Sequence, residues 1–174
     1  MIHILKNRIL KGVVTRHIRP GLPEEIEEAG LELRSLIRKR FGRSLHIREV
    51  DTGSCGACES EIIAANNPIY DLQRFGISFV ASPRHADALL VTGPVSKNML
   101  IALKKTYEAM PEPKFVITCG DCALDGGLFK GSYYVEGAVK DILPVDLHIP
   151  GCPPSPLNII QVLLGFLQKG ASDE

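Results

Sequence analysis

The sequence predicts an α/β domain in which a parallel sheet carries helices packed on its faces. Short β-type apolar runs alternate along the chain with runs of helical periodicity, a pattern typical of this fold class. The length of 174 residues suits one domain with a single core. Hydrophobic residues make up 45% and charged residues 23%, as in folded rather than disordered proteins.

A basic amphipathic arm is expected at the N-terminus, over residues 1–20. Apolar residues recur there at helical spacing, and the segment contains lysine and arginine but no acidic residue. It is either a surface helix or an arm that binds a partner. Residues 21–174 are then expected to form a single iron–sulfur α/β domain, for the reasons that follow.

A long helix is predicted to open the domain, over residues 23–41. Pro23 suits a first helical turn, acidic residues follow it, and basic residues precede the terminating Gly42, which matches the helix dipole. Further helices are expected to begin near Cys58, Ser96 and Pro156. The predicted strands are 45–50, 77–80, 88–92, 115–118 and 145–149.

All five cysteines lie at the ends of predicted strands. Cys55 and Cys58 follow the first strand, Cys119 and Cys122 follow the fourth, and Cys152 follows the last. Functional loops of a parallel sheet gather beyond the carboxyl ends of its strands, so we expect these thiols to lie together. A helix beginning near Cys58 would direct free backbone N–H groups at the first pair and lower the pKa of its thiols.

Spacing alone leaves three interpretations of the cysteines open. A 4Fe–4S cluster held by four cysteines from three loops uses the whole arrangement. A structural zinc site could use both Cys-x-x-Cys pairs, although about 60 residues separate them, against about 15–20 in a compact zinc ribbon. A thioredoxin-like dithiol needs only one pair and leaves the other cysteines without a role.

Charge and hydropathy exclude other classes of function. Lysine plus arginine and aspartate plus glutamate number 20 each, so no net field favours nucleic acid or an anionic membrane. No apolar run reaches the ~18–20 residues of a membrane span. The N-terminus also lacks the features of a signal peptide. We therefore expect no nucleic-acid partner and no transmembrane segment, and the cysteines favour metal or redox chemistry over disulfides.

Four sequence blocks, in this order, resemble the cluster-bearing subunit shared by respiratory complex I and the NiFe hydrogenases. They are DTGSCGACESE (51–61), SPRHADALLVTGPV (82–95), VITCGDCALDGG (116–127) and PVDLHIPGCPPSP (144–156). The resemblance implies a flavodoxin-like parallel sheet with helices on both faces. It also implies one 4Fe–4S cluster at the strand-end loops.

The resemblance implies which cysteines bind the cluster. The family's third ligand sits in a Gly-x-Cys-Ala context, found here at 120–123, and the fourth in Pro-Gly-Cys-Pro-Pro, found at 150–154. Cys119 lies outside both contexts, and its role stays open. The implied ligands are Cys55, Cys58, Cys122 and Cys152.

Three further residues match family positions near the cluster. Glu61 could relay protons or make local hydrogen bonds. Arg84 and His85 could stabilise the reduced, more negative cluster or lie in a surface turn. His148, in the last predicted strand, is expected to be a hydrogen-bonded core histidine.

The spacing of the first two cysteines separates the branches of the family. Complex I proteins carry two adjacent cysteines at this site, whereas two residues separate Cys55 from Cys58 here, as in the hydrogenases. The short chain resembles the membrane-bound, energy-converting group, formate hydrogenlyase included. The resemblance thus implies an electron-transfer subunit without a catalytic centre of its own. It would serve proton reduction or hydrogen oxidation at a NiFe large subunit.

The implied partners are that NiFe-type large subunit, a ferredoxin-like iron–sulfur subunit and membrane ion-translocating subunits. The expected location is peripheral, on the cytoplasmic face of the cell membrane. Two alternatives remain. One is the cluster-bearing subunit of a complex I-like NADH/quinone or sulfur oxidoreductase, and the other is a non-enzymatic zinc-binding scaffold.

Overall fold

The computed structural model describes residues 22–172, which are built around one parallel sheet. Its strands lie in the order β2-β1-β3-β5-β7, and every neighbouring pair is parallel. Counted within this sheet, that is the 2-1-3-4-5 order of flavodoxin-like folds, so the predicted sheet is confirmed. The strands are β1 (Leu45–Asp51), β2 (Ile77–Phe79), β3 (Ala88–Thr92), β5 (Phe115–Cys119) and β7 (Leu147–Ile149).

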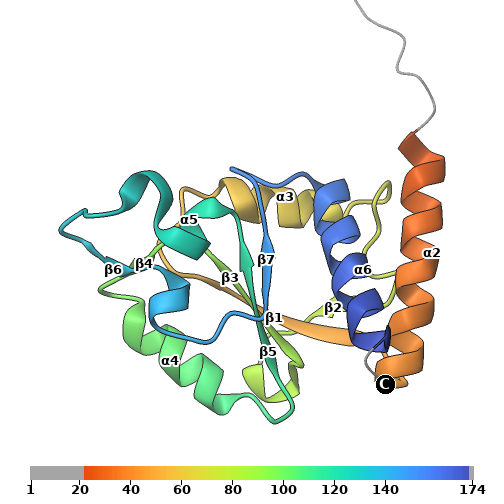
Figure 1. The fold of residues 1–174 in the computed structure, drawn as a ribbon, viewed down its shortest axis with the longest axis horizontal. Coiled ribbons are helices and arrows are strands. Elements are labelled where there is room, and N and C mark those ends of the chain that lie inside the picture. The colour runs from red at the N-terminus through yellow and green to blue at the C-terminus, as the bar shows by residue number, and fades with distance from the viewer. Residues whose placement is uncertain (1–21, 173–174) are drawn as a thin grey trace, which may run out of the picture.

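Helices cover both faces of the sheet (Figure 1). One face carries α2 (Leu22–Phe41), α3 (Ala57–Ala65) and α6 (Pro156–Ser172), with α2 and α6 side by side. The other carries α4 (Leu100–Ala109) and α5 (Asp121–Asp125). None of the helices within 22–172 is long and apolar enough to cross a membrane.

Smaller elements complete the described chain. Two short strands, β4 (Val95–Ser96) and β6 (Val135–Gly137), form a separate antiparallel pair. Three 3-10 turns lie in loops: η1 (Pro83–His85), η2 (Gly127–Phe129) and η3 (Val139–Asp141).

The two faces bury separate apolar cores, and β3 contributes to both. Ala88 and Leu90 pack with α2, α3 and α6, while Leu89 and Val91 pack with α4 and α5. Successive side chains of a strand point to opposite faces, so a strand covered on both sides must be apolar throughout. This explains the unbroken apolar run that predicted the strand.

The register sets four strand ends level at one edge of the sheet. Asp51 of β1 pairs with Thr92 of β3, Thr92 pairs with Cys119 of β5, and Cys119 pairs with Ile149 of β7. The loops that follow these strands therefore leave the sheet side by side. This carboxyl edge is where the cysteines were expected.

Two predicted boundaries were wrong. The helix expected near Ser96 begins at Leu100, because Ser96 belongs to β4 and its N–H donates to the Thr52 carbonyl oxygen (2.8 Å). The last strand begins at Leu147 rather than at 145. The helices predicted to open the domain and to begin at Pro156 are confirmed. The expected basic arm, 1–20, lies outside the described residues.

Two helical glycines offer a matched test of this packing. A Cβ at Gly30 of α2 would lie 2.2 Å from the Phe75 ring, whereas a Cβ at Gly165 of α6 would meet nothing within 4 Å. We expect Gly30→Ala to lower the free energy of unfolding by about 1–3 kcal/mol through overpacking. Gly165→Ala should raise it by about 0.5–1 kcal/mol through helix propensity. Urea unfolding measures both, and effects of the same sign would contradict the packing.

Candidate metal centre

The five cysteines lie on three loops at the carboxyl edge of the sheet. Cys55 and Cys58 follow β1, Cys119 ends β5, Cys122 lies in α5, and Cys152 follows β7. Figure 1 shows α3 and α5, which begin in these loops, at the same end of the sheet. The structure thus gathers all the cysteines that the sequence singled out.

The loop after β1 is held by its own short polar side chains. The Asp51 carboxylate accepts the N–H groups of Gly53 and Ser54, both at 2.8 Å, and the Ser54 hydroxyl accepts the N–H of Gly56 (3.0 Å). Gly56 has a φ of 85° and leads directly into α3. Such turns fix the backbone on either side of Cys55.

The same loop is anchored to the loop after β3. The buried Thr52 hydroxyl lies 2.8 Å from the Thr92 carbonyl oxygen and 3.0 Å from that of Gly93. A Cβ at Gly93 would lie 2.5 Å from the backbone nitrogen of Ser54, and the φ of Gly93 is 69°. Only glycine allows the two loops to approach this closely.

The loops after β5 and β7 are joined by backbone hydrogen bonds. The Gly120 N–H donates to the Ile149 carbonyl and the Asp121 N–H to the Gly151 carbonyl, both at 2.9 Å. In return, the Gly151 N–H donates to the Asp121 carboxylate at 2.9 Å. These bonds hold the cysteines of the two loops next to each other.

The thiols form two neighbouring pairs. Cys58 lies beside Cys119, and Cys122 lies beside Cys152. Cys55 lies close enough to Cys122 to act on it electrostatically. Cys55 and Cys152 are exposed, Cys58 and Cys122 are half-buried, and Cys119 is wholly buried. The site therefore opens to the surface on the side of Cys55 and Cys152.

The two pairs differ in their electrostatics. The neighbouring Cys119 thiol lowers the pKa of the Cys58 thiol, although burial and nearby carboxylates oppose it. The neighbouring Cys58 thiol, followed by burial, raises the pKa of Cys119. Burial also raises the pKa of Cys122, against the opposing effect of the nearby Leu128 backbone.

Two glycines leave room for cysteine sulfur atoms. The space around these sulfurs shows whether the residues fit a cluster. A Cβ at Gly120 would lie 2.6 Å from the Cys58 sulfur, and one at Gly127 would lie 2.6 Å from the Cys122 sulfur. Both glycines have positive φ, at 86° and 49°. Four thiolate donors beside bare backbone are the ligand set and the surroundings that an iron–sulfur cluster requires, so the residues fit this group.

Within residues 22–172, no three cysteine, histidine, aspartate or glutamate side chains converge closely enough to hold one metal ion. A 4Fe–4S cluster does not require such convergence, because each of its cysteines binds a separate iron. Beside Cys119, the Thr92 hydroxyl is buried and has no partner within the same residues. His148 Nδ1 lies 3.0 Å from Thr118 Oγ1, as expected of a hydrogen-bonded histidine.

The other predicted residues divide between the two edges of the sheet. Glu61 lies on α3 close enough to Cys58 to act on it electrostatically. Arg84 and His85 instead lie in η1, before β3, and His46 Nδ1 lies 3.1 Å from the His85 carbonyl oxygen. The length of β3, at about 3.3 Å per residue, separates this amino edge from the cysteines. We therefore correct the expectation that Arg84 and His85 neighbour the cluster.

Two acidic residues near the thiols were missed in the sequence. Burial, followed by the charges of Glu59 and Asp51, raises the pKa of Glu49 on β1. Both carboxylate oxygens of Glu59 are buried and have no hydrogen-bond partner in the described part of the chain. The available signal was the position of Glu59, directly after Cys58.

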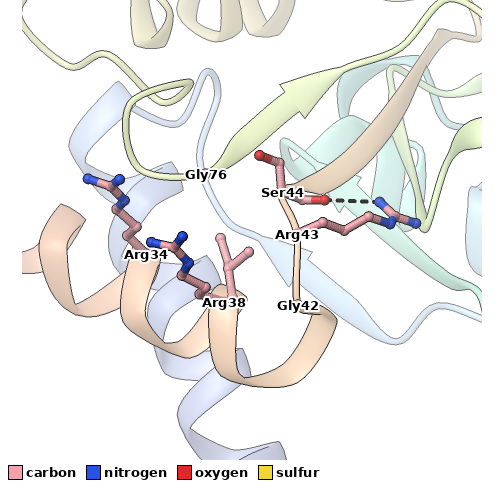
Figure 2. A pocket seen from close by; sticks show the side chains of 7 residues that line it. Arg34, Arg38, Gly42, Arg43, Ser44 and Gly76 are labelled. Carbon is pink, nitrogen blue, oxygen red and sulfur yellow. Dashed lines mark hydrogen bonds between the residues drawn. The ribbon is translucent and has the colours of Figure 1, made fainter.

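An arginine-lined cavity lies at the amino edge, away from the cysteines (Figure 2). It encloses about 250 Å³ and includes Arg34, Arg38 and Arg43 in its lining. Arg43 makes a 2.7 Å ion pair with Asp87, and Figure 2 shows its guanidinium bonded to the Ser44 carbonyl. Arg38 lies in the last turn of α2, where a cation complements the helix dipole. Structural contacts thus explain Arg38 and Arg43.

Replacing any of the four implied ligands by serine should remove or severely disturb the cluster, because a thiolate is lost. Cys119→Ser should retain it. Iron and acid-labile sulfide in the anaerobically reconstituted chain measure this, with about four of each expected in the wild type. Stoichiometric zinc without sulfide, or loss in Cys119→Ser with retention in Cys122→Ser, would contradict the assignment. The ligand variants are Cys55→Ser, Cys58→Ser, Cys122→Ser and Cys152→Ser.

Gly120→Ala should also disturb cluster loading, because the added methyl group meets the Cys58 sulfur. Gly131→Ala is a matched control. Gly131 has a similar φ of 81° against 86°, but nothing lies within 4 Å of its added Cβ. Both variants place a side chain at a positive φ, but only the methyl group at position 120 meets a sulfur, so only Gly120→Ala should lose iron. Equal iron contents in the two would show that close approach at Gly120 does not matter.

Known proteins similar to this chain include members of oxidoreductase complexes. The sequence model of the family described as "NADH ubiquinone oxidoreductase, 20 Kd subunit" matches residues 55–166. A probable membrane-bound hydrogenase subunit of Pyrococcus furiosus is 47% identical over 131 residues, which cover 75% of this chain and 78% of the relative. Formate hydrogenlyase subunit 7 of Escherichia coli is 42% identical over 151 residues, which cover 85% of this chain and 59% of the relative.

A solved structure supports the same relationship. A chain of the membrane-bound sulfane sulfur reductase, an archaeal respiratory membrane complex, matches with a TM-score of 0.64 and 33% identity. The match covers 81% of this chain and 78% of that one. The chain therefore belongs to the family of the 20 kDa subunit of NADH ubiquinone oxidoreductase and the NiFe hydrogenase small subunits, and is a subunit of an oxidoreductase.

Proposed function

We propose that this chain is the electron-transfer subunit of a membrane-bound NiFe hydrogenase complex. It binds one 4Fe–4S cluster through Cys55, Cys58, Cys122 and Cys152 and has no catalytic centre of its own. The observation that carries the proposal is the meeting of these cysteines, from three loops, at one edge of the sheet. The two residues between Cys55 and Cys58 and the hydrogenase relatives support the hydrogenase branch.

In the proposed reaction, this chain holds and orients the cluster. When bound, the cluster accepts and releases one electron at a time. The polar turn after β1 and the bonds between the β5 and β7 loops fix the thiolates in advance. The exposed Cys55 and Cys152 place one side of the site at the protein surface. Electrons can thus pass to a docked partner, and the chain needs no nucleophile or general base.

An exposed apolar lobe, residues 128–134, supports a partner that covers this site. Leu128 and Tyr133 are 91% and 88% exposed, and Phe129 and Tyr134 are also exposed. The lobe is continuous with the cysteines, because Gly127, the residue directly before it, lies against the Cys122 sulfur. Clustered apolar and aromatic side chains on a surface mark protein interfaces. We assign this surface, together with the open side of the site, to the NiFe-type large subunit.

The remaining partners follow from the proposed complex. A ferredoxin-like iron–sulfur subunit would supply electrons, and membrane ion-translocating subunits would couple the reaction to ion movement. The chain would then be peripheral, on the cytoplasmic face of the cell membrane. The membrane-bound assemblies named for two of the similar proteins support this arrangement.

A second candidate function is a complex I-like sulfur or quinone oxidoreductase. The similarity to the sulfane sulfur reductase chain favours it, since the same sheet edge would serve a different electron acceptor. The large subunit distinguishes the two functions. A hydrogenase large subunit must carry the cysteines that bind nickel, because nickel at such a centre needs thiolate ligands.

Membranes that contain the intact complex should evolve hydrogen when supplied with reduced ferredoxin or viologen. Adjacent cysteines would take two ligands from neighbouring backbone units, whereas the spacing between Cys55 and Cys58 relaxes this constraint, as in the hydrogen-metabolising branch. Hydrogen, quinol and sulfide are followed together, with Cys58→Ser membranes as the control. Quinol or sulfide without hydrogen, in a preparation with an intact cluster, would favour the second candidate.

A further inference from the structure

One buried hydroxyl near the cysteines has no hydrogen-bond partner in the described part of the chain. Thr92 is the last residue of β3 and has 0% of its surface exposed. Its Oγ1 is buried and makes no hydrogen bond within residues 22–172. An unpaired buried hydroxyl destabilises a protein, and nearly all buried polar groups are therefore paired. The missing partner of Thr92 needs an explanation.

A second buried threonine at the same edge shows the usual arrangement. Thr118 of β5 is also 0% exposed, but its Oγ1 lies 3.0 Å from His148 Nδ1 and 3.4 Å from the Leu147 carbonyl oxygen. Thr118 lies one residue before Cys119, which is the register partner of Thr92. Two threonines of equal burial on neighbouring strands thus differ in their bonding, and only Thr118 has its partner within the described chain.

The Thr92 side chain lies on the sheet face that α3 covers. Successive side chains of a strand alternate between faces, and Leu90, two residues earlier, packs in the core beneath α2, α3 and α6. Cys119 lies in the same core, next to Thr92 across the strand pair. Cys58 packs against this core as well, and its sulfur lies 2.6 Å from the position that a Cβ of Gly120 would take.

The loop that carries Cys55 closes over the other side of Thr92. A Cβ at Gly93, directly after Thr92, would lie 2.5 Å from the backbone nitrogen of Ser54. The hydroxyl is therefore enclosed between this loop and the end of β5. Because two of the implied ligands, Cys55 and Cys58, flank this enclosed space, a bound cluster would bring sulfur acceptors to the hydroxyl.

We propose that the Thr92 hydroxyl donates a hydrogen bond to a sulfur atom on the Cys58 side of the bound cluster and thereby raises the reduction potential of the cluster. The proposal rests on the proposed function, because it requires a cluster held by Cys58. Hydrogen bonds to the sulfurs are among the features by which a protein sets cluster potential. The reduced cluster carries one more negative charge than the oxidised cluster, so a donor stabilises the reduced form more.

A buried carboxylate offers a competing explanation. Glu59 follows Cys58 on α3, and both of its carboxylate oxygens are buried and unpaired within the residues that the structure describes. A buried water could join Thr92 to Glu59 without any contact between the hydroxyl and the cluster. In that arrangement, removal of the hydroxyl would take no donor away from the cluster, so the two explanations predict different reduction potentials.

Variants with and without the hydroxyl test the proposal in the full chain, reconstituted anaerobically with iron and sulfide. Thr92→Val removes the hydroxyl and keeps the shape of the side chain, and Thr92→Ala removes it if the valine impairs folding. Thr92→Ser keeps a hydroxyl. Thr118→Val is the matched control, since it removes an equally buried hydroxyl whose partner lies within the chain.

Redox titration followed by electron paramagnetic resonance gives the midpoint potential of each variant. At a fixed potential, Thr92→Val and Thr92→Ala should lower the ratio of reduced to oxidised cluster about tenfold, equivalent to about 59 mV for one electron. Thr92→Ser and Thr118→Val should stay near the wild type. Electron–nuclear double resonance, compared in light and heavy water, should show one exchangeable proton that is missing only in Thr92→Val and Thr92→Ala.

Three outcomes would overturn the proposal. An unchanged potential in Thr92→Val and Thr92→Ala would show that the hydroxyl does not act on the cluster, and would favour a water shared with Glu59. An equal shift in Thr118→Val would assign the effect to the loss of any buried hydroxyl at this edge. Cluster loss in all three Thr92 variants would make Thr92 a requirement for assembly. A wild-type chain that binds no cluster would instead defeat the proposed function itself, so the two failures can be told apart.

Discussion

The level ends of four parallel strands are the constraint on which the candidate site depends. Asp51, Thr92, Cys119 and Ile149 pair across β1, β3, β5 and β7, so the loops that carry the cysteines leave the sheet at the same height. A slip of one residue in any of these pairs would turn that strand's apolar side chains away from their core. The buried cores on both faces of the sheet therefore also fix the position of the site.

Above this edge, the loops approach one another closely because glycines leave room for the backbone and sulfur atoms of the neighbouring residues. Gly93 admits the backbone of Ser54, and Gly120 and Gly127 admit the sulfurs of Cys58 and Cys122. The carboxylates of Asp51 and Asp121 then fix the loops by accepting backbone N–H groups. The result is a site that is buried at Cys119 and open to the surface at Cys55 and Cys152.

Sequence patterns predicted the parts of this fold that follow from periodicity and failed where tertiary contacts decide. The unbroken apolar run of β3 and the amphipathic α2 were predictable because burial dictates their residues. The β4–β6 pair was not predictable, since a strand of two residues, Val95 and Ser96, is too short to show an alternating pattern. Arg84 was misplaced by the family resemblance, although its position before β3 already puts it at the amino edge of a parallel sheet. The contact between Cys119 and Cys58 depends on loop geometry and left no signal in spacing.

The central claim is that the three loops hold one 4Fe–4S cluster through four particular cysteines. Crystals or cryo-electron microscopy maps of the iron-loaded protein, with anomalous scattering at the iron edge for crystals, test it most directly. Iron should bond to the sulfurs of Cys55, Cys58, Cys122 and Cys152, with Cys119 in contact with Cys58 and bonded to no iron. A single metal ion at these loops, or iron bonded to Cys119 in place of Cys122, would contradict the account.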